Sequence, residues 1–100
     1  MKTTIQKGEK EIVAVFEGRL DTAAAGATGQ DLMPLYDCKN LDVILDCTKL
    51  EYISSSGLRL FLGVLKAAKP NGCKVYISGM NDDLKKVFAI TGFNSLFQFQ

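Results

Sequence analysis

Hydrophobic residues gather in short runs along the chain, and three of these runs have the composition of buried strands. They are residues 12–16 (IVAVF), 41–48 (LDVILDCT) and 73–78 (CKVYIS). The first run is apolar at every position, which predicts a strand covered on both faces of a sheet. A turn at residues 8–10 separates residues 3–7 from residues 11–18, so these two segments are predicted to form a hairpin.

The segments between the strands have the spacing of amphipathic helices. One helix face is predicted by apolar residues that recur three and four positions apart: Leu58, Phe61, Leu62, Leu65 and Ala68. Another helix is predicted between Asn81, a good capping residue that two acids follow, and Gly92, which favours termination. Residues 91–100 predict a short helical turn and a last strand.

Residues 21–36 are less regular. Three alanines after Asp21 favour a helix that Asp21 caps, whereas two glycines and Pro34 oppose it. We therefore predict a helix that is kinked near Pro34, with both of its leucines facing inward. Because strands separated by helices must pair in parallel, the order of elements predicts an α/β fold. It is a single domain, residues 1–100, with a mixed sheet of four to five strands and helices packed mainly on one face.

Composition restricts the function. The 100 residues are 47% hydrophobic and carry a net charge of +1, which suits one globular domain but not the basic surface of a nucleic-acid binder. The most apolar stretch, residues 58–68, is interrupted by charges and too short to span a bilayer, and the N-terminus has no signal-peptide pattern. We therefore expect a cytoplasmic protein with no nucleic-acid or membrane partner.

Cysteine and histidine usage limits the chemistry further. Three cysteines, Cys38, Cys47 and Cys73, have no CxxC spacing, which predicts buried or half-buried thiols in a reducing cytoplasm. Histidine is absent, so Ser-His-Asp and Cys-His catalysis are unavailable and a zinc site is disfavoured. No metal, cofactor or catalytic residue is expected, and any serine chemistry is expected to be done to this protein by another.

Three serines, Ser54–Ser56, stand at the start of the second predicted helix. Either Ser54 or Ser55 can cap free backbone N–H groups there, and Gly57 allows close backbone approach. A helix N-terminus also favours negative charge, so a phosphate on Ser56, of about −1.5 to −2, would be tolerated and would alter any surface that docks there. Spacing alone supports phosphorylation no more strongly than capping.

Three motifs occur in order along the chain: residues 16–25 (FEGRLDTAAA), 45–62 (LDCTKLEYISSSGLRLFL) and 90–98 (ITGFNSLFQ). Together they resemble the STAS domain family, specifically the small stand-alone anti-sigma factor antagonists of bacteria. The resemblance implies that Ser56, directly before Gly57, is phosphorylated by an anti-sigma factor that is an ATP-dependent serine kinase. The unphosphorylated form would bind this kinase and release the sigma factor. Phosphorylation would block binding, and a serine phosphatase would reset the switch.

The resemblance also assigns roles to other residues. It implies a partner-binding surface around the helix start: Asp21, Ser54, Ser55, Gly57, Leu58 and Arg59. Asp21 corresponds to an acid near the phosphorylation site, and Asp46 to a strand-end acid that orients the serine loop. A helix cap at Asp21 and local bonds from loop N–H groups to Asp46 are the structural alternatives. Well-known members have Asp where this chain has Ser54, which bears on kinase recognition.

Two other functions stay open at this point. STAS domains also serve as accessory subunits of lipid transporters or as signalling scaffolds, where the serine is a contact without a phosphorylation switch. A small enzyme or nucleotide-binding protein could use the same loop, although the lack of histidine, a P-loop and a metal-ligand set opposes this. ATP turnover by the isolated chain would support that third function.

Overall fold

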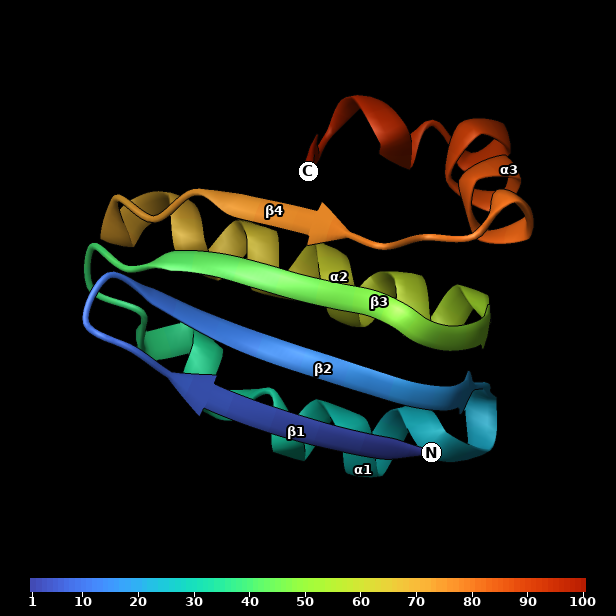
Figure 1. Cartoon of the computed structure of the whole chain (residues 1–100), viewed down its shortest axis with the longest axis horizontal. Coiled ribbons are helices and arrows are strands. Elements are labelled where there is room, and N and C mark those ends of the chain that lie inside the picture. Colours follow the sequence, from blue (N-terminus) through green and yellow to red (C-terminus); the bar gives the residue numbers. More distant parts are fainter.

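Five strands form one sheet in the order β1-β2-β3-β4-β5 (Figure 1). The structure, a computed structural model, describes residues 1–100. The strands are β1 (Lys2–Lys7), β2 (Glu11–Leu20), β3 (Asp42–Ile53), β4 (Val75–Ser78) and β5 (Gln98–Phe99). β1 pairs antiparallel with β2, and all other neighbours are parallel, which confirms the predicted hairpin and mixed sheet.

Three helices connect the parallel strands, and each is followed by a short 3-10 turn. They are α1 (Thr22–Asp31), α2 (Ser55–Ala68) and α3 (Asp82–Thr91), with the turns η1 (Met33–Asp37), η2 (Lys69–Asn71) and η3 (Phe93–Ser95). In Figure 1, α1 and α2 run behind the sheet, as predicted, and α3 lies beyond the end of β4. None of the helices combines the length and the hydrophobicity that crossing a bilayer requires.

The kink predicted near Pro34 is the break between α1 and η1. Pro34 stands at the beginning of η1, where its missing N–H costs no helical hydrogen bond. Leu32 and Leu35 are fully buried, as expected, and hold this break against the core. The predicted bounds of α3 are confirmed as well, because Asn81 caps its start and Gly92 ends it in the left-handed conformation.

Large apolar side chains from the sheet and the helices form one core. Phe61 of α2 lies between Phe16 of β2 and Phe88 of α3, with ring centroids 5.2 and 6.2 Å away. Full burial of one side chain of this size contributes about 1.5–3 kcal/mol, so this row of rings joins the sheet to both helices. The predicted apolar face of α2 is confirmed, except that Val64 is fully buried and Leu62 only half-buried.

The expectation that β2 is covered on both faces is wrong. Burial alternates along the strand: Ile12, Ala14 and Phe16 are buried, whereas Val13 and Val15 are half-buried. The helices cover one face only, and the other face of the sheet is open to solvent. The run of apolar residues in β2 therefore reflects its place between β1 and β3 and not a second covering layer.

β3 continues to Ile53, five residues beyond its predicted end. Its buried positions are two residues apart as far as Cys47 and three apart afterwards, at Leu50 and Ile53. The pairing with β2 shifts at two bulges, because β3 carries one extra residue at each. The bulges break the alternating pattern by which strands are recognised, which is why the sequence placed the end of the strand too early.

Two of the three cysteines form a disulfide, so the expectation of three thiols is wrong. Cys38 follows η1 and Cys73 precedes β4, and these connections meet at the amino ends of β3 and β4. The two Cα atoms are 6.6 Å apart, although 35 residues separate them in sequence. Cys47 is a buried thiol, and burial, together with the neighbouring Asp46 carboxylate, raises its pKa above the ordinary value.

Candidate functional site

Two helix starts lie side by side at the carboxyl ends of β2 and β3. Leu20 and Ile53, the last residues of these strands, are partners in the sheet. The Ser54 N–H donates to the Leu20 carbonyl at 2.9 Å, which extends the pairing by one residue. The residue after each strand then caps a helix: Asp21 caps α1 and Ser54 caps α2. We call the following residues the paired helix starts: 21–24 and 54–57.

Both caps satisfy a backbone N–H that the helix itself cannot. Oδ1 of Asp21 accepts a hydrogen bond from the Ala24 N–H at 2.9 Å, and Oγ of Ser54 accepts one from the Gly57 N–H at 3.2 Å. Of the two capping residues that the sequence allowed, the structure selects Ser54. A cap of this kind stabilises a helix by about 0.5–2 kcal/mol. Asp21 is a helix cap too, as the structural alternative proposed, and it lies beside Ser54.

The three serines differ in exposure, and this difference separates their roles. Ser54 is only 8% exposed and its hydroxyl is engaged in the cap. Ser55 is exposed and Ser56 is half-buried, and neither hydroxyl takes part in a hydrogen bond within the protein. These two residues are the first two of α2, where the positive end of the helix dipole favours an anion. The chemistry available here is therefore modification or binding at Ser55 or Ser56.

Gly57 lets α2 begin directly against the strand ends. A Cβ atom at this position would lie 2.7 Å from Cγ of Leu20 and 2.8 Å from Cγ1 of Ile53, well inside an ordinary contact. Leu58 is 5% exposed and packs into the core, so it supports the surface from below and offers no side chain to a partner. Arg59, in the first turns of α2, is exposed.

An aromatic ring that the sequence did not predict, Tyr52, lies beside the paired helix starts and contacts the cation Arg19. The Arg19 guanidinium carbon lies 4.5 Å from the centroid of the Tyr52 ring, in the geometry of a cation–π contact. These residues are partners in the sheet, one position before Leu20 and Ile53. Tyr52 is 39% exposed, and because Leu20 and Ile53 face the core, the pair lies on the side of the sheet that the helices leave open. Both residues lie inside the recognised motifs, but the bulges in β3 conceal which residue of β2 faces Tyr52.

The structure does not bring Asp46 to the serine segment. Oδ1 of Asp46 accepts hydrogen bonds from the Thr48 N–H at 3.0 Å and the Thr48 hydroxyl at 2.7 Å. These bonds satisfy the backbone N–H and the hydroxyl group of Thr48, a strand residue at the first bulge. Ser54 stands eight positions after Asp46 along the chain, a path of about 26 Å at roughly 3.3 Å per residue. The local hydrogen bonds anticipated as the alternative are the ones present, and they go to the strand instead of the serine loop.

Comparison with known proteins identifies relatives over nearly the whole chain. The sequence profile described as STAS domain matches residues 2–100. The protein BtrV of Bordetella bronchiseptica, an anti-sigma factor antagonist by name, is 32% identical over 97 residues, which are 97% of this chain and 84% of BtrV. An anti-sigma-B factor antagonist of Staphylococcus aureus is 33% identical over 79 residues, which are 79% of this chain and 73% of that protein.

Solved structures with the same fold are more distant in sequence. An anti-sigma-factor antagonist domain protein from Planctomyces limnophilus has a TM-score of 0.88 at 14% identity, covering 98% of this chain and 87% of that one. SpoIIAA in its unphosphorylated form has a TM-score of 0.75 at 17% identity, covering 99% and 87%. Its phosphorylated form, from Bacillus, has a TM-score of 0.74 at 17% identity, covering 99% and 91%. At these sequence identities the structural similarity establishes a shared fold only.

Proposed function

Because the chain belongs to the STAS domain family, we propose that it is an anti-sigma factor antagonist controlled by phosphorylation at the start of α2. One observation supports this above the others: Ser55 and Ser56 present free hydroxyls at a helix N-terminus that lies beside a second one. The unphosphorylated surface binds an anti-sigma factor of the ATP-dependent serine kinase type, which then releases its sigma factor. A serine phosphatase reverses the modification.

A phosphate at this position changes the surface without unfolding the domain. It adds a charge of about −1.5 to −2, which the dipole of a helix start stabilises by about 0.3–1 kcal/mol at an exposed site. The Ser54 cap already satisfies the Gly57 N–H, so the phosphate does not compete for that bond. The relative SpoIIAA has been solved in both unphosphorylated and phosphorylated forms, which supports the view that this fold tolerates such a group.

The choice between the two serines rests on different arguments. The motif predicts Ser56, because it directly precedes Gly57. Exposure favours Ser55, because a kinase must place the acceptor hydroxyl in line with the γ-phosphate of ATP and Ser56 is half-buried. Ser55 also stands four residues before Arg59, on the same helix face, where a phosphate and a guanidinium can pair. We therefore propose Ser55 as the acceptor and keep Ser56 as the alternative that the experiment must exclude.

Loss of binding follows from desolvation and charge. Docking onto the unphosphorylated surface removes water from Ser55, Arg59 and the Arg19–Tyr52 pair, and aromatic and arginine side chains of this kind contribute strongly to interfaces. A doubly charged group at the centre of the interface must then lose its water, and Arg59 offsets only part of its charge. Burial of the remaining charge without a cation on the partner costs several kcal/mol, which is enough to abolish a micromolar complex.

The experiment compares single substitutions in the native bacterium. Affinity-tagged wild type, Ser55→Ala, Ser56→Ala, Ser55→Asp and Ser56→Asp are recovered with their bound proteins, and phosphate is located by mass spectrometry. We expect an ATP-binding kinase with the wild type and both alanine variants, its loss with Ser55→Asp, and no phosphate on Ser55→Ala. Phosphate on Ser56 alone would reassign the acceptor. Equal capture by all five proteins, with no phosphate on either serine, would refute the switch.

The same samples test the transporter-accessory and scaffold alternative. In that function the serine segment is a contact only, so the alanine and aspartate variants would recover the same membrane-protein or scaffold partners as the wild type. The phosphorylation switch instead predicts partners that depend on charge at the start of α2. Partner identity and phosphate content therefore distinguish the two functions in one experiment.

A further inference from the structure

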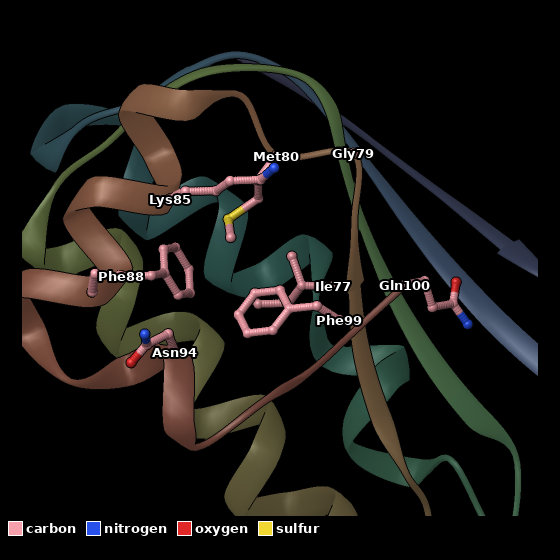
Figure 2. A pocket seen from close by; sticks show the side chains of 9 residues that line it. Ile77, Gly79, Met80, Lys85, Phe88, Asn94, Phe99 and Gln100 are labelled. Carbon is pink, nitrogen blue, oxygen red and sulfur yellow. The ribbon is translucent and has the colours of Figure 1, made fainter.

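A cavity of about 620 Å³ lies between β4, α3 and the C-terminal strand β5 (Figure 2). Pockets that bind small molecules typically measure about 300–1,000 Å³, so this one is large enough for a ligand. None of the residues that line it belongs to the paired helix starts. A ligand here would therefore occupy a site separate from the proposed phosphorylation surface.

The cavity lies over one end of the hydrophobic core, where Phe99 is its exposed aromatic side chain. Phe99 of β5 is the sheet partner of Ile77 in β4, and neighbouring partners point to the same face of a sheet. Ile77 is 1% exposed, whereas Phe99 is 44% exposed. The Phe99 ring approaches Phe88 of α3 edge-on, with centroids 6.4 Å apart, but the space beside it is not filled by protein. Phe99 thus occupies a core-facing position in the sheet, but one side of its ring has no apolar neighbour.

The lining has an apolar interior and a single charge. Figure 2 shows Phe88, Ile77 and Phe99 around the space, with the Met80 side chain reaching into it from above. Met is flexible and polarisable, so it adapts to ligands of different shapes. Lys85 lies beside Met80 and is the one ionisable side chain among the lining residues. Lys85 takes part in neither of the two ion pairs in the protein, so its ammonium group is available.

We propose that this cavity binds a small organic monocarboxylate with an apolar body, of the size of a medium-chain fatty acid. The tail packs against Met80 and Phe99, and the carboxylate pairs with the Lys85 ammonium group at the rim. A single cation with no acidic neighbour in the lining matches one negative charge. A phosphate ester carries nearly two charges and would be left undercompensated, whereas a neutral ligand would make no use of Lys85. This proposal does not depend on the phosphorylation switch.

The test is a titration of the full chain with decanoate, kept below its micelle concentration and followed by two-dimensional amide NMR. We expect saturable shifts in residues 77–80, 85–89 and 98–100, with the paired helix starts unaffected. Decanol, which has the same tail without the charge, should bind more weakly. The Lys85→Gln variant should lose about two- to fivefold in decanoate affinity, the effect of one exposed ion pair. Lys86→Gln, one residue along α3 and outside the cavity, should bind like the wild type.

Three results would overturn the proposal. Absence of saturable shifts with decanoate would show that the cavity does not take the ligand class. Equal affinity for decanol and decanoate, or no difference between the two lysine variants, would show that the carboxylate is not recognised. Shifts centred on the fully exposed side of α3 at Ile90, which is 86% exposed, would indicate adhesion to an apolar surface outside the cavity.

Discussion

Replacement of Gly57 by alanine tests whether the paired helix starts depend on close packing. The added Cβ would sit 2.7 Å from Leu20 and 2.8 Å from Ile53, whereas carbon atoms in good contact are about 3.5–4.0 Å apart. Cγ of Leu20 is a branch-point atom, Cγ1 of Ile53 is bonded to one, and both side chains are buried, so the helix or the strand ends must move. Overpacking of this kind costs about 1–3 kcal/mol, and alanine recovers up to about 1 kcal/mol through helix propensity. We expect a net loss of about 1–2 kcal/mol in the free energy of unfolding.

The assay is thermal and urea unfolding followed by circular dichroism, with Gly26→Ala as the matched control. A domain of this size loses about 4–8 °C in Tm for each kcal/mol, so Gly57→Ala should unfold roughly 5–15 °C below the wild type. Gly26 lies in α1 with no atom within 4 Å of an added Cβ, so Gly26→Ala should stabilise by about 0.4–1 kcal/mol. If Gly57→Ala were as stable as Gly26→Ala, the close packing at the start of α2 would not restrict the residue there.

Three further outcomes follow from other contacts. Reduction of the Cys38–Cys73 disulfide reopens a loop with a sequence separation of 35. The gain in chain entropy of the unfolded state should then lower the free energy of unfolding by up to about 4 kcal/mol. An unchanged Tm, measured once thiol counting has confirmed that the bond is reduced, would contradict this expectation. Ser54→Ala should lower the free energy of unfolding by about 1 kcal/mol and Ser54→Asp should restore it; equal urea midpoints for the two would show that the cap contributes nothing. Burial raises the pKa of Cys47, so the folded state keeps a proton that the unfolded state loses above its pKa of about 8.5. Stability should therefore fall with rising pH above that point by up to about 1.4 kcal/mol per unit, and Cys47→Ala should remove this slope in pH-dependent urea unfolding.

Local patterns predicted most elements of this fold, and the errors have a common cause. The hairpin, the kink near Pro34, the bounds of α3 and the capped start of α2 depend on residues within one turn or strand, so the sequence contains them directly. The end of β3 was misplaced because its bulges are defined by pairing with β2 and not by the residues of β3 alone. The Cys38–Cys73 bond likewise depends on two connections that meet only after the sheet has formed.

The candidate site shows the same division between local and distant information. Ser54 as a cap and Gly57 as a packing residue could be anticipated from the start of the helix. The contact between Arg19 and Tyr52 could not, because the bulges determine which residues become neighbours. The family resemblance assigns Asp46 to the serine loop as a strand-end acid. Once β3 is extended to its true end, the acid lies with Thr48 at the first bulge instead.

The bulges in β3 also bear on how such a site can change by insertion and deletion. β3 uses 12 residues where its partner β2 uses 10, yet both strands finish together at Leu20 and Ile53. Removing one residue at each bulge would leave two strands of equal length and keep the pairing between Leu20 and Ile53. Because bulges increase local twist, such a deletion would rotate the start of α2 relative to α1 while leaving its serines unchanged. Strand length is thus a variable that can redirect the serines toward a different partner without a single substitution among them.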